Sequence, residues 1–374
     1  MKIVLASGTP YLPQVRGGVE VNTHEIATEL IARGHAVSVL TRLSYRDTFG
    51  LRARLTQGLR SPGSSDTALG YPVFRARQPS AMVPQLDRPD VVVIQNGNPW
   101  PISTAFAERG VPTLIYLHGL GFDGWPRQAG ATGSDRIPAA GYLSISDFVK
   151  RRFEDRHGIA TQVIPPIHRP ERYAGAPRDP RTVTLINPVA VKGVDLALEV
   201  AARCPEIPFC FVKGWPLGLR GTRRLKARMA RLPNVTFREN VDMRSVYGWT
   251  RLLLVPSQWE AETWGRVATE AHYNGIPVVS SDRGGLPESV GPGGCILPVD
   301  AAPEAWAAVI RTLWTDADAY RRKSEAARAY ALRAAIDVDA QIARFEAILS
   351  QVARCPPRLA HESESRPVDD LAIA

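Results

Sequence analysis

Two glutamates on either side of a glycine are the strongest chemical signal in the sequence. Glu262 lies just before a segment of helical pattern that starts at Gly265, and Glu270 follows inside that segment. The first N–H groups of a helix lack intrahelical partners, so Gly265–Val267 is suited to bind an anion. Beside it, Glu262 could accept hydrogen bonds from sugar hydroxyls and Glu270 from a ribose. In the alternative interpretation, Glu262 caps the helix and Glu270 is a solvated helix residue.

A pair of glycines precedes another helical segment near the start of the chain. Gly17 and Gly18, in Arg16-Gly17-Gly18-Val19-Glu20, follow the first apolar segment and open the helix. Two glycines allow the backbone to approach a ligand closely, and the helix N-terminus favours a phosphate. Because Gly-Gly before a helix is also a common turn, the motif alone leaves both interpretations open.

Short apolar segments alternate with helical patterns through most of the chain. Near-continuous apolar strands are typical of parallel sheets that are covered on both faces. We therefore predict an α/β protein with two doubly wound, Rossmann-like domains, whose ligands bind at the carboxyl ends of the strands, in the cleft between domains. The segments lie at 2–6, 36–40, 90–95, 113–117 and 142–145, and again at 182–186, 209–212, 235–237, 252–255 and 277–280.

Proline-rich residues 169–181 predict the linker between these domains, which we place at 1–168 and 182–335. A C-terminal helix at 336–354 could cross back to the first domain. Residues 355–374 contain few large apolar side chains, so we expect a disordered tail.

Residues 256–288 contain several short motifs at fixed spacing: Pro256-Ser257, Glu262, Gly265, Glu270-Ala271, Gly275-Ile276-Pro277-Val278 and Gly284-Gly285-Leu286-Pro287-Glu288. These motifs resemble those of the retaining, GT-B-fold glycosyltransferases of family 4, also called group 1. By this resemblance, the first domain would bind the acceptor and the second a nucleotide sugar. The resemblance implies that Glu262 contacts the hydroxyls of the donor sugar and that Glu270 contacts the nucleotide ribose. The loop between Glu262 and Val267, with Thr263, Trp264, Gly265 and Arg266, would hold the sugar and diphosphate.

The expected diphosphate anchor departs from the family pattern. Lys192, followed by a glycine, matches the family lysine, but Asn187 stands where the family has an arginine. A lone ammonium can hold a phosphate as a point charge, but not in the bidentate way of a guanidinium. Arg266 or Lys213 could replace the missing guanidinium. Alternatively, Lys192 is an exposed lysine at a helix start.

Three further sites follow from the resemblance. His118, at the end of an apolar segment, would lie against the donor sugar, or else it is a loop histidine that caps a turn. Gly17 and Gly18 match the family's N-terminal glycine loop. Asn240 and Val241 would hold the nucleotide base through their backbone.

The composition limits the protein's class more than its ligands. The chain has 374 residues and a formal net charge of +9, which is compatible with nucleic acid, an anionic membrane or phosphorylated ligands. Basic stretches at 42–60 and 150–156 could dock on an anionic lipid surface, and 220–231 is rich in basic residues. For all three, solvated helix faces are the simpler interpretation. No segment approaches the roughly 20 apolar residues that span a bilayer, so we expect a cytoplasmic protein, with peripheral contact at the inner membrane face as an option.

The sequence thus predicts a hexosyltransferase-type, retaining glycosyltransferase that uses a UDP- or GDP-sugar as co-substrate and no cofactor. No Cys/His cluster has zinc-ligand spacing and no paired acidic motif presents itself, so no metal is implied. Lys192 and helix N-termini would stabilise the leaving diphosphate. By the family's front-face route, the departing phosphate oxygen accepts the acceptor's proton, and Glu262 positions rather than attacks.

The acceptor and some alternatives stay open. The acceptor could be a small molecule, a glycan or a lipid-linked molecule, contacted by residues 42–70, which we expect to be irregular, and 119–138; no nucleic-acid partner is expected. A GT-B nucleotide-sugar 2-epimerase is one alternative, and a non-catalytic basic protein that binds nucleic acid or membrane is another. A dehydrogenase is disfavoured because Gly17-Gly18 does not supply the full G-x-G-x-x-G fingerprint.

Overall fold

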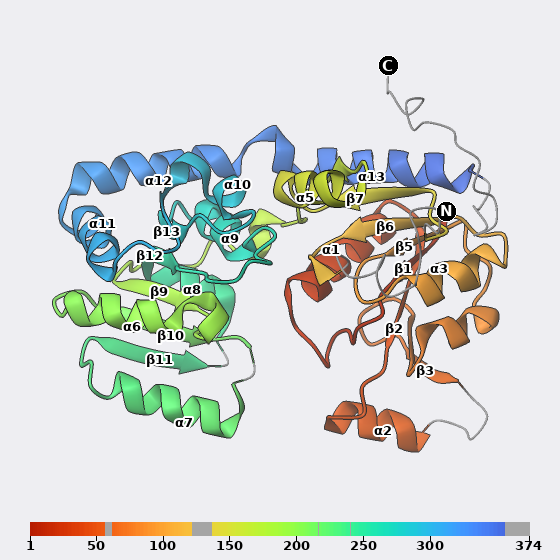
Figure 1. Cartoon of the computed structure of the whole chain (residues 1–374), viewed down its shortest axis with the longest axis horizontal. Helices are drawn as coiled ribbons and strands as arrows, with labels where there is room; N and C mark the ends of the chain where they lie inside the picture. Colours follow the sequence, from red (N-terminus) through yellow and green to blue (C-terminus); the bar gives the residue numbers. More distant parts are fainter. Residues whose placement is uncertain (57–61, 122–136, 216, 240, 356–374) are drawn as a thin grey trace. The chain divides into compact units, whose positions relative to one another are not determined.

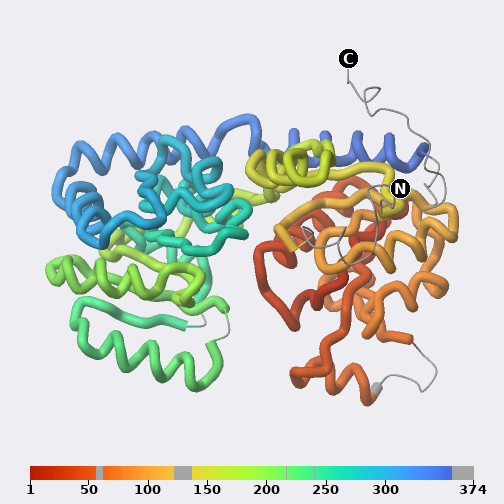
Figure 2. The backbone as a smooth tube through the Cα atoms, viewed as in Figure 1, coloured from red at the N-terminus to blue at the C-terminus, as the bar shows by residue number. Residues whose placement is uncertain are grey.

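The computed structural model describes residues 1–56, 62–121, 137–215, 217–239 and 241–355 (Figure 1). Contacts divide the chain into two units. The first comprises Met1–Leu143, His157–Gln162 and the chain from Arg344 onward, and the second comprises Ser144–Arg156 and Val163–Ala343. Figure 2 follows the backbone through both units.

The first unit is built on a sheet with the strand order β3-β4-β2-β1-β5-β6-β7-β8. Its central pairs are parallel, and β3 runs antiparallel to β4 at the edge. The strands are β1 (Lys2–Ala6), β2 (Ala36–Arg42), β3 (Gly63–Asp66), β4 (Val73–Ala76), β5 (Val91–Ile94), β6 (Thr113–Leu117), β7 (Gly141–Ser144) and β8 (Gln162–Val163).

Apolar side chains of this sheet pack against helices to form the core of the first unit. Val92 and Ile94 of β5 cluster with Ile102 and Phe106 of α3 (Trp100–Ala107), and all four are buried. Helices α1 (Gly18–Ala32) and α2 (Thr48–Thr56) and the 3₁₀ segment Pro79–Gln85 also belong to this unit.

The second unit contains a fully parallel six-stranded sheet in the order β11-β10-β9-β12-β13-β14. The strands are β9 (Thr182–Ile186), β10 (Phe209–Lys213), β11 (Val235–Glu239), β12 (Thr250–Val255), β13 (Val278–Ser281) and β14 (Gly294–Leu297). The helices are α5 (Asp147–His157), α6 (Val194–Arg203), α7 (Gly218–Met229), α8 (Met243–Trp249), α9 (Arg266–Tyr273), α10 (Leu286–Val290), α11 (Pro303–Thr315), α12 (Ala317–Ala331) and α13 (Val338–Ala353).

Strand β12 is apolar at successive positions, and its side chains pack into two different buried clusters. Leu252 and Leu254 belong to one buried cluster with α6 and α11, whereas Leu253 and Val255 belong to another with α9 and α10. Successive side chains of a strand point to opposite faces, so both faces of this sheet are covered. The predicted fold class, two Rossmann-like parallel-sheet domains, is confirmed.

Some predicted boundaries differ from the contacts in the structure. The contacts group Ser144–Arg156 with the second unit, although the linker prediction had placed this range in the first domain. Helix α13 is divided, with its residues to Ala343 in the second unit and those from Arg344 in the first. In the first unit, the Phe345 ring lies 6.1 Å from that of Tyr116, and Glu346 accepts a hydrogen bond from His35 at 2.7 Å.

The prediction that residues 42–70 are irregular is wrong. They contain α2 and β3, and β3 pairs with β4 although its own sequence, Gly63-Ser64-Ser65-Asp66, has no apolar pattern. The edge of β4 supplies the hydrogen bonds, and Asp66 Oδ2 accepts from Nε of the buried Arg75 at 3.0 Å. The predicted tail and most of the predicted acceptor segment 119–138 lie outside the described residues. Within the described ranges, no helix has both the length and the apolar character needed to cross a membrane.

Candidate functional site

A lysine and a glutamate meet beyond the carboxyl ends of β9 and β12. Lys192 Nζ donates a hydrogen bond to Glu262 Oε2 at 2.5 Å, and Ser257 Oγ donates to the same oxygen at 2.9 Å. Glu262 is buried, and the Lys192 side chain is 15% exposed. The structure thus brings together two residues that the sequence analysis had selected from separate motifs.

The loops that carry this pair are held together through their backbones. Gly193, next to Lys192, has φ +77°, and a Cβ there would lie 1.9 Å from the Pro256 carbonyl oxygen, so the turn requires glycine. Gln258 N–H donates to Val191 O at 2.9 Å. These contacts fix the turn before α6 against the loop after β12, and therefore set the distance between Lys192 and Glu262.

Two tryptophans flank the lysine. Lys192 Nζ lies 5.1 Å from the ring centroid of Trp215 and 5.0 Å from that of Trp259. The two indole rings are nearly perpendicular, with centroids 6.1 Å apart. The sequence analysis missed both residues; their only signal was a tryptophan close to each predicted motif, after Lys213-Gly214 and three positions before Glu262.

Glu270 belongs to a second cluster, on α9. Tyr247 donates from its hydroxyl to Glu270 Oε2 at 2.6 Å, and Arg266 Nε lies 3.7 Å from Oε1. The Arg266 guanidinium also donates to Ile167 O at 3.2 Å and to the Tyr173 hydroxyl at 3.0 Å. Burial, together with the Glu270 carboxylate, raises the pKa of Tyr247 well above its ordinary value, so the hydroxyl keeps its proton.

His168 faces the same carboxylate without forming a strong ion pair at neutral pH. Its Nδ1 donates to Pro166 O at 2.9 Å, and its Nε2 lies 3.9 Å from Glu270 Oε1. Burial, and then the nearby Arg266 charge, lower the pKa of His168 well below its ordinary value. Glu270 therefore has Arg266 as its cationic neighbour and a neutral imidazole beside it.

The two candidates to replace the family arginine have other partners. Arg266 lies beside Glu270 and donates a hydrogen bond to the Tyr173 hydroxyl. Lys213 Nζ donates to Glu239 Oε2 at 3.0 Å, and hydrogen bonds from Lys213 and Lys226 lower the pKa of Glu239. Asn187 itself, with φ +59°, accepts hydrogen bonds at Oδ1 from the N–H groups of Gly214 and Trp215.

The predicted loop that begins at Glu262 leads directly into α9. Gly265, with φ +83°, is the N-cap of α9 and has no side chain that could cap the helix. Trp264 is buried and donates from Nε1 to Thr269 Oγ1 at 3.1 Å, whereas Val267 packs against the cluster that includes Leu286. Gly285 N–H donates to the Glu262 carbonyl at 2.8 Å, so the predicted Gly-Gly turn supports the loop that carries Glu262 and Thr263.

The site residues predicted in the first unit lie at the ends of its elements. His118 follows β6, is buried, and its Nε2 bonds to Gln95 Oε1 at 3.1 Å. Gly17 is the N-cap of α1, which begins at Gly18, and its N–H donates to Glu20 Oε2 at 2.9 Å. Burial raises the pKa of Glu20. Their predicted roles stay predictions.

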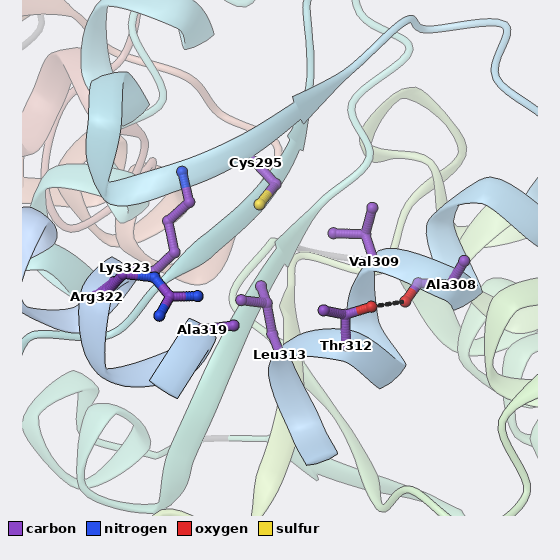
Figure 3. Close-up of a pocket in the computed structure, with 8 residues that line it drawn as sticks. All are labelled: Cys295, Ala308, Val309, Thr312, Leu313, Ala319, Arg322 and Lys323. Carbon is purple, nitrogen blue, oxygen red and sulfur yellow. Dashed lines mark hydrogen bonds between the residues drawn. The ribbon is translucent and has the colours of Figure 1, made fainter. Parts of the chain in front are cut away.

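The predicted base-binding pair is described only in part, because Asn240 lies outside the described residues and Val241 packs partly buried beside Val246. A separate pocket of about 350 Å³ lies between α11, α12 and β14 (Figure 3). Apolar and polar side chains both line it, and Lys323 Nζ donates to Gly294 O at 2.6 Å. The lining residues are Cys295, Ala308, Val309, Thr312, Leu313, Ala319, Arg322 and Lys323. None of the predicted site residues lines this pocket.

Comparisons with known families cover most of the chain. Residues 176–330 match the family described as glycosyl transferases group 1, and residues 16–172 match glycosyltransferase family 4. The D-inositol 3-phosphate glycosyltransferase of Mycolicibacterium smegmatis is 28% identical over 243 residues, which are 62% of this chain and 55% of that protein. The enzyme of the same name from Mycobacterium tuberculosis is 33% identical over 125 residues, 31% of this chain and 25% of that one. The chain thus matches about half or less of the length of these relatives.

Solved structures show the same fold. A glycosyltransferase from Rickettsia africae has a TM-score of 0.70 at 16% identity, covering 94% of this chain and 98% of that one. Anabaena Alr3699/HepE in complex with UDP and glucose gives 0.70 at 19% identity, covering 93% and 99%. WaaG, a glycosyltransferase involved in lipopolysaccharide biosynthesis, gives 0.64 at 17% identity, covering 93% and 99%.

Proposed function

Because this chain belongs to the group 1 glycosyltransferases and has the GT-B fold, we propose that it transfers a sugar from a nucleotide diphosphate sugar to an acceptor hydroxyl. The observation that carries the proposal is the contact between Lys192 and Glu262, three residues before the N-cap of α9. The contact joins an ammonium and a carboxylate close to a helix N-terminus, and these groups together support the binding of a diphosphate and of sugar hydroxyls. Structures of Alr3699/HepE with UDP and with UDP-glucose favour a UDP-sugar over a GDP-sugar.

In this proposal, Lys192 exchanges its partner when the donor binds. The ammonium turns from Glu262 to the diphosphate, and Glu262, still held by Ser257, accepts hydrogen bonds from hydroxyls of the sugar. As the bond between the anomeric carbon and the phosphate oxygen breaks, Lys192 and the first N–H groups of α9 stabilise the charge that develops on the diphosphate. These groups act without a metal or cofactor.

The stereochemistry that we propose is retention by the front-face route. The acceptor oxygen forms its bond to the anomeric carbon on the side from which the diphosphate departs. The acceptor's proton passes to the departing phosphate oxygen, so no side-chain nucleophile is required. The acceptor is a small molecule, a glycan or a lipid-linked molecule, and a lipid-linked acceptor would bring the protein into peripheral contact with a membrane.

A ligand screen followed by product analysis tests the proposal. We expect the melting temperature to rise with UDP or a UDP-sugar, and less with GDP. Mass spectrometry with candidate acceptors should then detect a glycosylated product, and the coupling constant of its anomeric proton in the NMR spectrum should match the configuration of the donor. An epimer formed from the donor alone would indicate a 2-epimerase instead. The absence of a shift with any nucleotide would contradict the proposed function.

A further inference from the structure

We infer that Asn187, Trp215 and Trp259 are positioning residues for Lys192. Asn187 fixes the backbone that carries Trp215, and the two indole rings hold the lysine ammonium where the donor diphosphate would bind. The inference rests on the proposed function, because it assigns the arrangement a role in diphosphate binding. Its geometric part, the restraint of Lys192, can be tested without any sugar transfer.

The first argument is the placement of the two rings around one ammonium. Both ring centroids lie within about 6 Å of Lys192 Nζ, the range in which a cation is attracted to an aromatic face. A lysine side chain has four carbons and many rotamers, so its position depends on its neighbours. Here Glu262 holds the ammonium by a hydrogen bond and the indoles attract it as well. When the diphosphate displaces the carboxylate, the rings remain.

The second argument is the hydrogen bonding of Asn187. Its Oδ1 accepts from the Gly214 N–H at 3.0 Å and from the Trp215 N–H at 2.7 Å. A Cβ at position 214 would lie 2.6 Å from this oxygen, so the close approach depends on glycine. An arginine at 187 could not make these bonds, since a guanidinium has no acceptor. The departure from the family pattern therefore removes a cation and adds a support for Trp215.

The backbone of Asn187 fits the same interpretation. Its φ of +59° lies in the left-handed region, which asparagine adopts more readily than most residues other than glycine. Pro188 follows, and β9 ends at Ile186 just before it. The side chain is thereby turned across to the loop that follows β10. The chain has no second cation at position 187, and Asn187 instead helps to restrain the ammonium of Lys192.

The test compares the loss of an aromatic face with the loss of volume. We expect Trp215→Leu and Trp259→Leu each to raise the donor KM, and the Kd for UDP, by about threefold to tenfold, because a cation–π contact is lost. Trp215→Phe keeps an aromatic face and should stay within about twofold of the native protein. Asn187→Gly keeps the backbone conformation without the acceptor, and should resemble Trp215→Leu.

A matched control uses another cation–π contact of the same unit. The Arg251 guanidinium lies 5.0 Å from the Trp314 ring, and these residues belong to neither glutamate cluster. Trp314→Leu should leave the donor KM unchanged. Equal effects of Trp215→Leu and Trp215→Phe, or of Trp215→Leu and Trp314→Leu, would overturn the inference and indicate general packing.

A second readout is independent of the reaction. The rate at which an amine-reactive succinimidyl ester labels Lys192, followed by peptide mass spectrometry, should rise at least about threefold in Trp215→Leu, because the ammonium is less restrained. Labelling of Lys213 serves as the internal reference. Equal rates at Lys192 in the native protein and the variant would overturn the positioning role, even if the native protein transfers sugar. Faster labelling in a protein that binds no nucleotide would support the restraint and contradict only the proposed function.

Discussion

Glu262 and Glu270 are eight positions apart, are 5% and 6% exposed, and each has a cationic neighbour, yet their surroundings differ. Glu262 lies on a loop and bonds to a lysine and a serine. Glu270 lies on a helix, where it accepts from Tyr247 and faces an arginine that has partners of its own. An ammonium is a compact point charge that can change partner, whereas a multiply bonded guanidinium keeps its place. The motif therefore contains one acid whose cationic partner can be exchanged, Glu262, and one acid whose surroundings are fixed, Glu270.

The fixed acid can still serve the role implied by the family resemblance. A carboxylate has about four lone-pair sites, so Glu270 could accept a ribose hydroxyl without losing Tyr247. Its network would hold the carboxylate in a set orientation before the nucleotide binds. The comparison therefore predicts that changes at Glu262 act mainly on transfer, and that changes around Glu270 act on stability as well.

The largest expected effect is on catalysis by Glu262→Gln. The amide keeps the shape and one acceptor but loses the charge, so kcat/KM should fall by about 10²- to 10³-fold. The urea-unfolding free energy should change by less than about 1 kcal/mol, since Ser257 and Lys192 retain an acceptor. Native transfer rates in this variant would contradict the role assigned to Glu262.

At the second glutamate, activity and stability should fall together. Glu270→Ala leaves Arg266 without its carboxylate neighbour in a buried place, which should cost about 3 kcal/mol of unfolding free energy. The loss of the proposed ribose contact should lower kcat/KM by about tenfold to a hundredfold. Tyr247→Phe removes a single donor and should cost about 1–2 kcal/mol.

Glu206→Ala, in the exposed pair with Arg311, is the matched control for these changes and should leave the unfolding free energy close to that of the native protein. If Glu270→Ala lost activity with full stability, the proposed difference between the two acids would be wrong.

Two buried histidines, His168 beside Glu270 and His272 two residues further along α9, should make the folded state sensitive to acid. Burial, with nearby arginines, lowers the pKa of His168 and brings that of His272 to about 3. Below the ordinary value of 6.5, the unfolded chain binds protons that the folded state does not bind. The unfolding free energy should therefore fall as the pH decreases below 6.5, and should be independent of these histidines above it.

His272→Gln tests this directly, because glutamine does not titrate. Between pH 6 and pH 4, the slope of unfolding free energy against pH should become shallower by up to about 1.4 kcal/mol per pH unit. Comparing slopes separates the titration from any constant cost of the substitution. An unchanged slope would show that His272 does not resist protonation in the folded state.

The smallest effect is expected at Lys213, which the sequence offered as a substitute for the family arginine. Its ammonium bonds to Glu239, and Glu239 also pairs with Lys226. Lys213→Ala should therefore change the donor KM by less than about threefold. A tenfold or larger rise would place Lys213 on the diphosphate and would weaken the assignment of Lys192 as the main anchor.

Much of the fold could be predicted because its strands are short apolar segments between helices. Leu252–Val255 is apolar throughout since both faces of its sheet are covered. The polar strand β3 could not be predicted, because its pairing depends on the edge of β4 and on Arg75, residues that come later in the chain. Its own residues have no strand propensity to reveal it.

Some residues of the candidate site could likewise be predicted from the sequence, and others could not. Glu262, Lys192 and Gly265 belong to motifs with fixed spacing, so their importance could be predicted from sequence. Tyr247 and Trp215 could not, since each acts on a residue 23 positions away, on Glu270 and Lys192 respectively. Such contacts form only when α8 packs beside α9 and when the loops after β9 and β10 come together.

The central claim, that Lys192 and Glu262 form the donor site of a sugar transferase, is tested most directly by kinetics of Lys192→Ala. The account predicts that its kcat/KM for the donor identified in the screen falls at least about 10²-fold. Circular dichroism and the melting temperature without ligand should remain close to native. Full transfer rates in folded Lys192→Ala protein would contradict the account.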